Sequence, residues 1–213
     1  MDTTTAYRIA RIVGRLTPAA CALPFIQFPA AAADPCPDVE IVFARGTTEP
    51  PGVGGVGQAF VDSLRSQLGG RSVEVYAVDY PASSDFDRST PAGATDASSH
   101  IQSMAANCPN TRMVLGGYSQ GAGVIDLATT AMPPQVADHV AATALFGAPE
   151  SAFADTLSPG PLPTIGPLYA TKTIDLCVPN DPICSGGWDM RAHVAYVETG
   201  MTNQAATFAA SRL

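Results

Sequence analysis

The chain has 213 residues, 46% of them hydrophobic, which suffices for one sizeable core and excludes a disordered or low-complexity protein. Eleven Lys and Arg stand against 19 Asp and Glu, and the resulting net charge of -8 would repel a phosphate backbone. Composition and charge therefore exclude a nucleic-acid-binding protein and favour a single globular domain.

The first 33 residues have the order of a secretory signal peptide. Arg8, Arg11 and Arg15 precede an apolar stretch of small residues at 16–29, and four alanines at 30–33 supply an A-x-A cleavage site. A membrane anchor is the alternative, but three prolines interrupt the apolar stretch, which is short for a bilayer. We therefore expect a secreted, extracellular protein that consists of one domain, residues 34–213, after cleavage.

From residue 39 onward, short apolar runs rich in β-branched residues alternate with longer segments whose apolar residues have helical spacing. This alternation is typical of an α/β fold, in which helices cover both faces of a mostly parallel sheet. The predicted strands are residues 39–44, 73–79, 112–116, 141–146 and 171–176. The predicted helices are residues 56–68, 94–107, 122–132 and 199–213.

Two segments between these elements have no regular pattern. Residues 81–91 are polar with an embedded Phe86, and residues 149–167 contain five prolines among apolar side chains. Irregular segments of this length in a compact domain are more often functional than idle. A proline-stiffened connection that only covers the sheet remains the alternative for each of them.

Four cysteines follow the predicted signal peptide, and an even number in an exported chain indicates disulfides. Cys177 and Cys184 are separated by a turn-rich hexapeptide, so we pair them with each other and Cys36 with Cys108. No cysteine has a partner at C-x-x-C spacing, which argues against a zinc site.

Residues 117–121 read Gly-Tyr-Ser-Gln-Gly and lie between a predicted strand and a predicted helix. This is the G-x-S-x-G pattern of a nucleophile elbow, a turn so sharp that only glycine fits beside the serine. In this setting the pattern predicts that Ser119 is a catalytic nucleophile.

A serine nucleophile needs a base, and the chain has three histidines. His100 precedes Ser119, against the order Ser, Asp, His of sheet hydrolases, and His139 lies just before a predicted strand. His193 follows the last predicted strand in a loop. It is therefore the predicted base.

The acid that orients the base must lie between Ser119 and His193. Asp181 comes directly after the last predicted strand, inside the predicted Cys177–Cys184 loop, and is our choice. Asp189 is close to His193 in sequence and remains an alternative. The oxyanion of the transition state needs donors, which the backbone amide of Gln120 and the amide or hydroxyl of Thr47 would supply.

The chain resembles the cutinase family of secreted serine esterases. The matching segments are residues 44–49 (Ala-Arg-Gly-Thr-Thr-Glu), residues 117–121, residues 177–184 and His193, in the family's order and spacing. The resemblance implies an α/β-hydrolase three-layer sandwich with a central five-stranded parallel sheet and no cap domain. It also implies that Ser119, Asp181 and His193 form the triad and that Thr47 and Gln120 form the oxyanion hole, although many members have serine where this chain has Thr47.

The predicted function is hydrolysis of short- to medium-chain carboxylic esters, including lipids or polyesters, through an acyl-enzyme on Ser119. Acetyl-polysaccharide esterase and phospholipase A activities on the same fold are alternatives. A secreted binding module that has lost activity is an alternative of another class. No metal or organic cofactor is expected.

Phe86, Trp188 and Met190 could form an apolar rim for acyl chains or lipid surfaces, and ordinary loop packing explains them equally well. The expected partners are therefore an ester or lipid substrate and, transiently, a lipid surface. We expect the protein to be a monomer.

Overall fold

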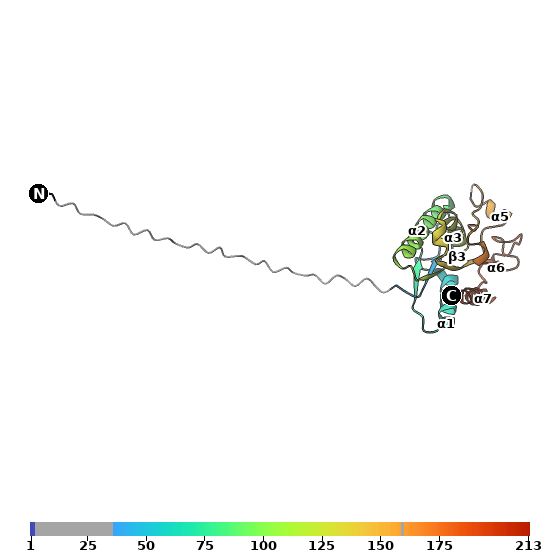
Figure 1. The fold of residues 1–213 in the computed structure, drawn as a ribbon. Helices are drawn as coiled ribbons and strands as arrows, with labels where there is room; N and C mark the ends of the chain where they lie inside the picture. The colour runs from blue at the N-terminus through green and yellow to red at the C-terminus, as the bar shows by residue number, and fades with distance from the viewer. Residues whose placement is uncertain (3–35, 159) are drawn as a thin grey trace. The chain divides into compact units, whose positions relative to one another are not determined.

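The computed structural model describes residues 1–2, 36–158 and 160–213 (Figure 1). Its centre is a parallel sheet with the strand order β2-β1-β3-β4-β5. Residues 3–33 of the predicted signal peptide lie outside the described residues. The strands are β1 (Val39–Ala44), β2 (Val73–Ala77), β3 (Arg112–Tyr118), β4 (Val140–Phe146) and β5 (Thr173–Leu176).

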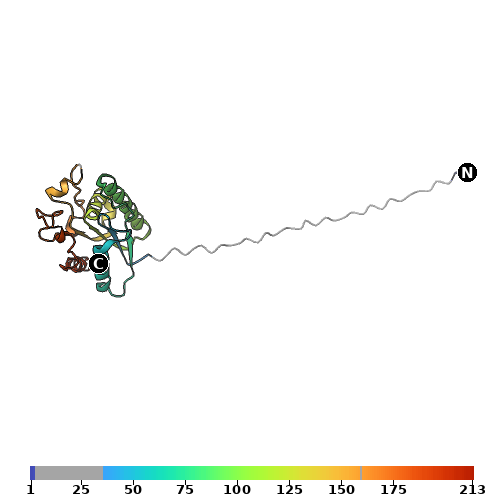
Figure 2. The same ribbon diagram turned by 180° about the vertical axis from the view of Figure 1, so that it is seen from behind.

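Helices cover both faces of this sheet (Figures 1 and 2). Helices α1 (Gly54–Gln67) and α7 (Met201–Ala210) pack on one face, and α2 (Phe86–Asn107) and α3 (Gln120–Ala131) pack on the other. Side chains alternate along β1, so that Phe43 contacts the α1 side while Val42 contacts the α2 side. The predicted three-layer α/β fold is confirmed.

The second long helix differs from its prediction, since α2 begins at Phe86 and not at residue 94. Half of the segment 81–91, predicted to be irregular, is therefore helical. Pro91 suggested a break, but it lies in the second turn, where its missing N–H removes a single helical hydrogen bond. The early start brings Phe86 and Asp87 to the same end of the sheet as Ser119.

Four short elements were not predicted, because three or four residues are too few to show a helical period. These short elements are α4 (Pro134–Ala137), α5 (Ala152–Asp155), the 3-10 helix η1 (Ala170–Lys172) and α6 (Met190–His193).

None of the helices in the described part of the chain is both long and apolar enough to cross a membrane.

Two disulfides have the predicted pairing. Cys36 and Cys108 join the segment before β1 to the end of α2, across 72 residues of sequence. Cys177 and Cys184 close a short loop directly after β5. The second disulfide therefore lies at the carboxyl edge of the parallel sheet, where α/β folds place their ligands.

Candidate active site

Ser119 lies in the sharp turn between β3 and α3. Its backbone has a φ of 54° and a ψ of -122°, a positive-φ conformation that is strained for serine. The neighbouring glycines are required by close contact: a Cβ on Gly117 would collide with the backbone of Gly121, and one on Gly121 with the backbone of Ala44. The turn that the sequence motif predicted is therefore present, with the serine at its tip.

Two hydrogen-bond distances connect Ser119 to the predicted base and acid. His193 Nε2 lies 2.9 Å from Ser119 Oγ, and His193 Nδ1 lies 2.8 Å from Asp181 Oδ2. With Asp181 ionised, Nδ1–H donates to the carboxylate and leaves Nε2 free to accept the proton of the serine hydroxyl. The fold thus brings together the three side chains named from the sequence.

The local setting of His193 differs from the prediction. It is the last residue of the short helix α6 and not part of a loop. Asp189, the alternative acid, accepts a hydrogen bond from the backbone N of Arg191 at 2.9 Å and so caps that helix. The carboxylate that contacts His193 is that of Asp181.

Asp181 is fully buried, yet three donors stabilise its ionised form. Burial acts to raise its pKa, but hydrogen bonds from His193, from the Tyr196 hydroxyl (2.5 Å) and from the Ile183 backbone N (2.8 Å) outweigh burial and hold the pKa below its usual value. Asp181 is therefore a carboxylate at neutral pH, as the orientation of His193 requires.

The loop that carries Asp181 is held at several points. The Cys177–Cys184 disulfide closes it, and Asp181 N donates to Val178 O at 3.0 Å. The carbonyl of Ile183 accepts from the backbone N–H groups of Glu150 and Ser151, each at 3.0 Å. The segment after β4 therefore braces the loop from outside.

Two tyrosines that the sequence analysis did not identify complete the site. Tyr118 donates its hydroxyl to the carbonyl of His193 at 2.7 Å, and its ring lies 5.1 Å from the imidazole ring. Tyr196 is fully buried, and its hydroxyl binds the same Asp181 oxygen as His193. Gly147, with a φ of 60°, leaves room for this hydroxyl, because a Cβ there would lie 2.7 Å from it.

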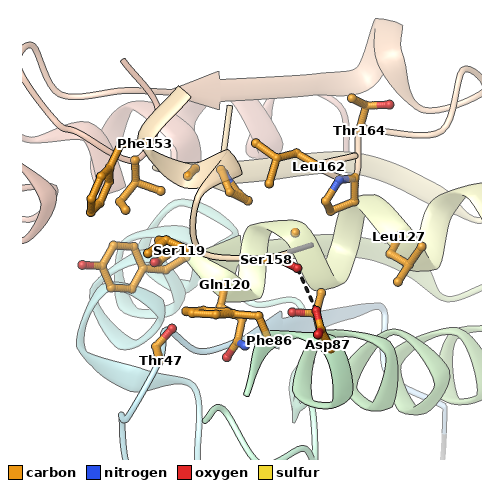
Figure 3. A pocket seen from close by; sticks show the side chains of 18 of the residues that line it. Thr47, Phe86, Asp87, Ser119, Gln120, Leu127, Phe153, Ser158, Leu162 and Thr164 are labelled. Atoms are coloured by element: carbon orange, nitrogen blue, oxygen red, sulfur yellow. Dashed lines mark hydrogen bonds between the residues drawn. The ribbon is translucent and has the colours of Figure 1, made fainter. Parts of the chain in front are cut away.

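The segment that carries Thr47 is fixed by charged side chains. Arg45 donates to the carbonyls of Glu49 (2.8 Å) and Tyr80 (2.6 Å). The carboxylate of Glu49 accepts from the backbone N–H groups of Gly46 (2.6 Å) and Gly55 (2.8 Å). Thr47 is thus presented on a rigid turn, and it lines the same cavity as Ser119 and Gln120 (Figure 3).

Gln120 begins α3, so its backbone N–H has no partner within the helix. Its side-chain amide donates to the carbonyl of Ser83 at 3.0 Å, and its side-chain oxygen accepts from the Ser89 hydroxyl at 3.5 Å, which itself accepts from Ser83 N at 3.0 Å. The side chain therefore ties the segment before α2 to the serine turn, while the amide remains available beside Ser119.

The cavity at Ser119 has a volume of about 1000 Å³ and is mainly apolar. Phe86 and Met190, two of the three predicted rim residues, line it. Trp188 is 89% exposed and lines a smaller adjoining hollow, which shares Phe153 with the main cavity. Both segments predicted to be irregular, 81–91 and 149–167, supply lining residues.

The other two histidines lie outside this site. His100 contacts the buried carboxylate of Glu40 at 2.9 Å and stacks on the ring of Tyr76, with ring centres 3.5 Å apart. His139 precedes β4, and its carbonyl accepts a hydrogen bond from Met113 N. Neither contacts Ser119, as their positions in the sequence predicted.

Comparison with known proteins identifies related chains. A model of the family described as Cutinase matches residues 35–213. A protein named Carboxylesterase Culp1 from Mycobacterium tuberculosis is 61% identical over 214 residues, which cover 98% of each chain. A protein named Phospholipase Culp4 from the same organism is 50% identical over 220 residues, covering 98% of this chain and 93% of that protein.

Solved structures have the same fold. A Trichoderma reesei cutinase bound to a phosphonate inhibitor superimposes with a TM-score of 0.69 at 36% identity, covering 84% of this chain and 77% of that one. The catalytic core domain of an acetyl xylan esterase from Trichoderma reesei gives a TM-score of 0.68 at 24% identity, covering 84% of this chain and all of that one. The second likeness concerns the fold alone.

Proposed function

This chain belongs to the cutinase family and is a serine carboxylic ester hydrolase, and from that premise we propose that Ser119, His193 and Asp181 are its catalytic triad. The observation that carries the proposal is the unbroken line of contacts from Ser119 through His193 to Asp181, at 2.9 and 2.8 Å, on the wall of an apolar cavity.

In the first step His193 Nε2 takes the proton of Ser119 while Oγ attacks the ester carbonyl. The imidazolium that forms is stabilised by the ionised Asp181, which keeps its own charge throughout. His193 then gives the proton to the leaving alcohol oxygen, and an acyl-enzyme remains on Ser119. Water attacks this ester in the second step by the same proton transfers, and the carboxylic acid leaves.

The oxyanion formed in each step needs fixed donors close to Ser119. We assign this role to the backbone N–H of Gln120, at the start of α3, and to Thr47, on its braced turn. Removal of one such donor typically lowers kcat by about 100- to 1000-fold. Thr47→Val keeps the shape of the side chain and removes its hydroxyl. A fall of kcat by this factor in the variant would indicate that the hydroxyl is the donor, and an unchanged kcat would indicate the backbone N–H.

The triad is tested by Ser119→Ala, assayed on a soluble butyryl ester. We expect the turnover to fall by about a thousandfold or more, with an unchanged melting temperature, because the nucleophile is lost and the fold is kept. A serine-directed organophosphate should label the native protein at Ser119 and leave the variant unlabelled. A loss of less than about tenfold would refute the assignment.

Lipid surfaces are a second class of contact that the site supports. Trp188 and Val194 are 89% and 66% exposed, and Met190 is 53% exposed beside His193. Met190 and Val194 line the cavity at Ser119, and Trp188 lines the adjoining hollow. Exposed apolar side chains at such hollows are typical of contact sites for apolar partners. The relative named Phospholipase Culp4 agrees with a lipid ester as substrate.

We also propose that the protein is secreted as a monomer with residues 34–213 as the mature domain. Two disulfides within the described residues support an oxidising compartment. All the residues of the triad and its supporting contacts come from one chain, so no second copy is needed to complete the site. The boundary is tested by sequencing the N-terminus of the exported protein, which should be Asp34.

A further inference from the structure

Residues 80–83 form a strap that contacts the turn carrying Thr47. Thr48 N donates to the carbonyl of Ala82 at 2.6 Å. Both residues of this hydrogen bond have a positive φ, 64° at Thr48 and 48° at Ala82, although neither is glycine. Such conformations cost energy, and they persist only where surrounding contacts hold them, most often at functional sites. The strained contact therefore marks the place where the strap holds the Thr47 turn.

A second pair of contacts joins the strap to the same turn. Arg45 donates to the carbonyl of Tyr80 at 2.6 Å, and the Tyr80 hydroxyl donates in return to the carbonyl of Arg45. The two residues are 4% and 5% exposed, and a hydrogen bond that is shielded from water is costly to break. The strap and the Thr47 turn are therefore held as one unit.

The far end of the strap is joined to Gln120 by a closed ring of three hydrogen bonds. The side-chain amide of Gln120 donates to Ser83 O at 3.0 Å, and Ser83 N donates to Ser89 Oγ at 3.0 Å. The Ser89 hydroxyl then donates to Gln120 Oε1 at 3.5 Å, which closes the ring. Each member donates one hydrogen bond and accepts one, so both ends of the Gln120 side-chain amide are bound.

Ser89 is the member of this ring that belongs to α2. It lies in the first turn of that helix and is fully buried. A hydroxyl can accept and donate at the same time, which is what the N–H of Ser83 and the side-chain oxygen of Gln120 require. Alanine at this position would leave both of these groups without that partner. An unsatisfied buried polar group is destabilising, so the strap and the Gln120 side chain would rearrange.

The strap and the ring together connect the two residues assigned to the oxyanion hole. The strap holds the Thr47 turn at one end, and the ring holds Gln120 at the other. In Figure 3 these two residues come from separate segments and lie near Ser119. Oxyanion donors are effective only at about 3 Å from the oxyanion, and a misplacement of about 1 Å can lower the rate about a hundredfold. The spacing between the donors must therefore be fixed before the substrate binds.

We propose that Ser89 is a positioning residue of the oxyanion hole: its hydroxyl closes the ring and thereby fixes the spacing between Thr47 and the backbone N–H of Gln120. The proposal rests on the proposed function, since it needs these two residues as oxyanion donors. The oxyanion develops only when the serine attacks the ester. Ser89 should therefore act on kcat and leave KM nearly unchanged.

The test is Ser89→Ala, assayed on a soluble butyryl ester. We expect kcat to fall about tenfold, which is less than for the removal of a donor, because both donors stay in the chain and only their spacing is released. KM should stay within about twofold of the native value. The affinity for a boronic acid that forms a tetrahedral adduct with Ser119 should fall by about the same factor as kcat, since the adduct places an oxygen in the oxyanion hole.

Thr111→Val is the matched control. Thr111 is 1% exposed, and its hydroxyl donates to the carbonyl of Pro37 at 2.6 Å, away from the cavity at Ser119. Both variants lose one buried hydroxyl, so the melting temperature should fall in both. Thr111→Val should keep the native kcat and the native affinity for the boronic acid. Equal values of kcat in the two variants would overturn the positioning role of Ser89.

A double-mutant cycle tests the ring itself. Gln120→Met removes the side-chain amide and keeps the backbone N–H, so it should also lower kcat about tenfold. The double variant should show little further loss, because either substitution opens the ring. Losses that multiply to about a hundredfold would overturn the proposal, as would a raised KM with an unchanged kcat in Ser89→Ala. Gln120→Met also provides the test if Ser89→Ala does not fold.

Failure of the proposed function would give a different result. Ser119→Ala would then leave the rate of ester hydrolysis unchanged, whatever the effect of Ser89→Ala. A rate that depends on Ser119, together with a native kcat in a folded Ser89→Ala, would instead overturn the positioning role alone.

Discussion

Tyr196 contacts the same oxygen of Asp181 as His193, and we predict from this contact that Tyr196 positions the proposed triad. Its hydroxyl lies 2.5 Å from Asp181 Oδ2, and its ring meets the imidazole ring edge to face at 6.4 Å between centres. The hydroxyl also lies 3.4 Å from the Sγ of Cys184. One side chain therefore connects the acid, the base and the disulfide that holds the acid's loop.

Tyr196→Phe removes the hydroxyl and keeps the ring. A hydrogen bond to a charged group contributes enough that we expect kcat/KM to fall about tenfold. This hydrogen bond helps to hold the pKa of Asp181 low, so its loss raises that pKa. Protonation of Asp181 would then begin at a higher pH, and the acid limb of the pH–rate profile should move upward.

The matched control for this variant is Tyr76→Phe, because the Tyr76 hydroxyl binds Asp96, outside the site, at 3.0 and 3.1 Å. Both variants lose one buried or half-buried hydroxyl contact, so a purely structural effect would appear in both melting temperatures. An unmoved acid limb in Tyr196→Phe would contradict the positioning role. Rate measurements between pH 4 and pH 9 on a soluble ester make the comparison.

The short loop from Cys177 to Cys184 illustrates how one element positions the acid. The loop is closed by a disulfide, and its backbone is braced by the segment after β4. The other disulfide joins the segment before β1 to the end of α2, with no contact to Asp181. The two disulfides therefore have separable effects on activity and on stability.

The double variant Cys177→Ala, Cys184→Ala should lower kcat/KM at least tenfold at a temperature where the protein is folded, because the Asp181 loop loses its closure. Its stability should fall by about 2.5 kcal/mol in the chain-entropy model. Cys36→Ala, Cys108→Ala should cost more stability, about 4 kcal/mol, and leave kcat/KM near the native value. Denaturant unfolding and rate assays check both. Equal losses of activity in the two folded variants would exclude a specific role for the short loop.

Asp126 affects the stability of the whole molecule. It is 3% exposed on α3, and its Oδ1 has no hydrogen-bond partner among the described residues. Burial, together with the charges of Asp175 and Glu150, raises its pKa to about 8. The folded protein therefore keeps a proton on Asp126 at neutral pH, whereas the unfolded chain has lost it above about pH 4.

The pH dependence follows from this difference in bound protons. Between about pH 4 and pH 8 the folded state holds one more proton at this position, so the contribution of Asp126 to stability falls as pH rises. Asp126→Asn removes the titrating group. We expect the free energy of unfolding of the variant, relative to native protein, to be higher at pH 8.5 than at pH 5 by up to about 4 kcal/mol.

Urea unfolding of both proteins at the two pH values measures this difference directly. Asp96→Asn is a suitable comparison, since Asp96 is a carboxylate on α2 that already accepts from Tyr76 and Asp79 N. A difference between native and Asp126→Asn that stays constant from pH 5 to pH 8.5 would contradict the protonated state of Asp126.

The sequence by itself determined the class of fold, the disulfide pairing and the three residues that meet at the site. Strand and helix periods are local, so the central strands could be predicted within a few residues, and the turn around Ser119 needs glycines that are adjacent in sequence. The order Ser, Asp, His along the chain then selected Asp181 and His193 as the acid and the base predicted to act with Ser119. These features depend on neighbours in sequence or on chemistry that admits few residue types.

Only the tertiary structure decided the contact of Tyr196 with Asp181, the start of α2 at Phe86 and the shape of the cavity at Ser119. Each depends on contacts between segments far apart in sequence, such as Ser158 with Asp87 or Gly123 with Pro149 and Pro163. No local pattern encodes such a distance, because it results from how the helices and loops pack on the sheet. The residues of the proposed triad can therefore be named from the sequence, whereas the shape of the cavity beside them is determined by packing.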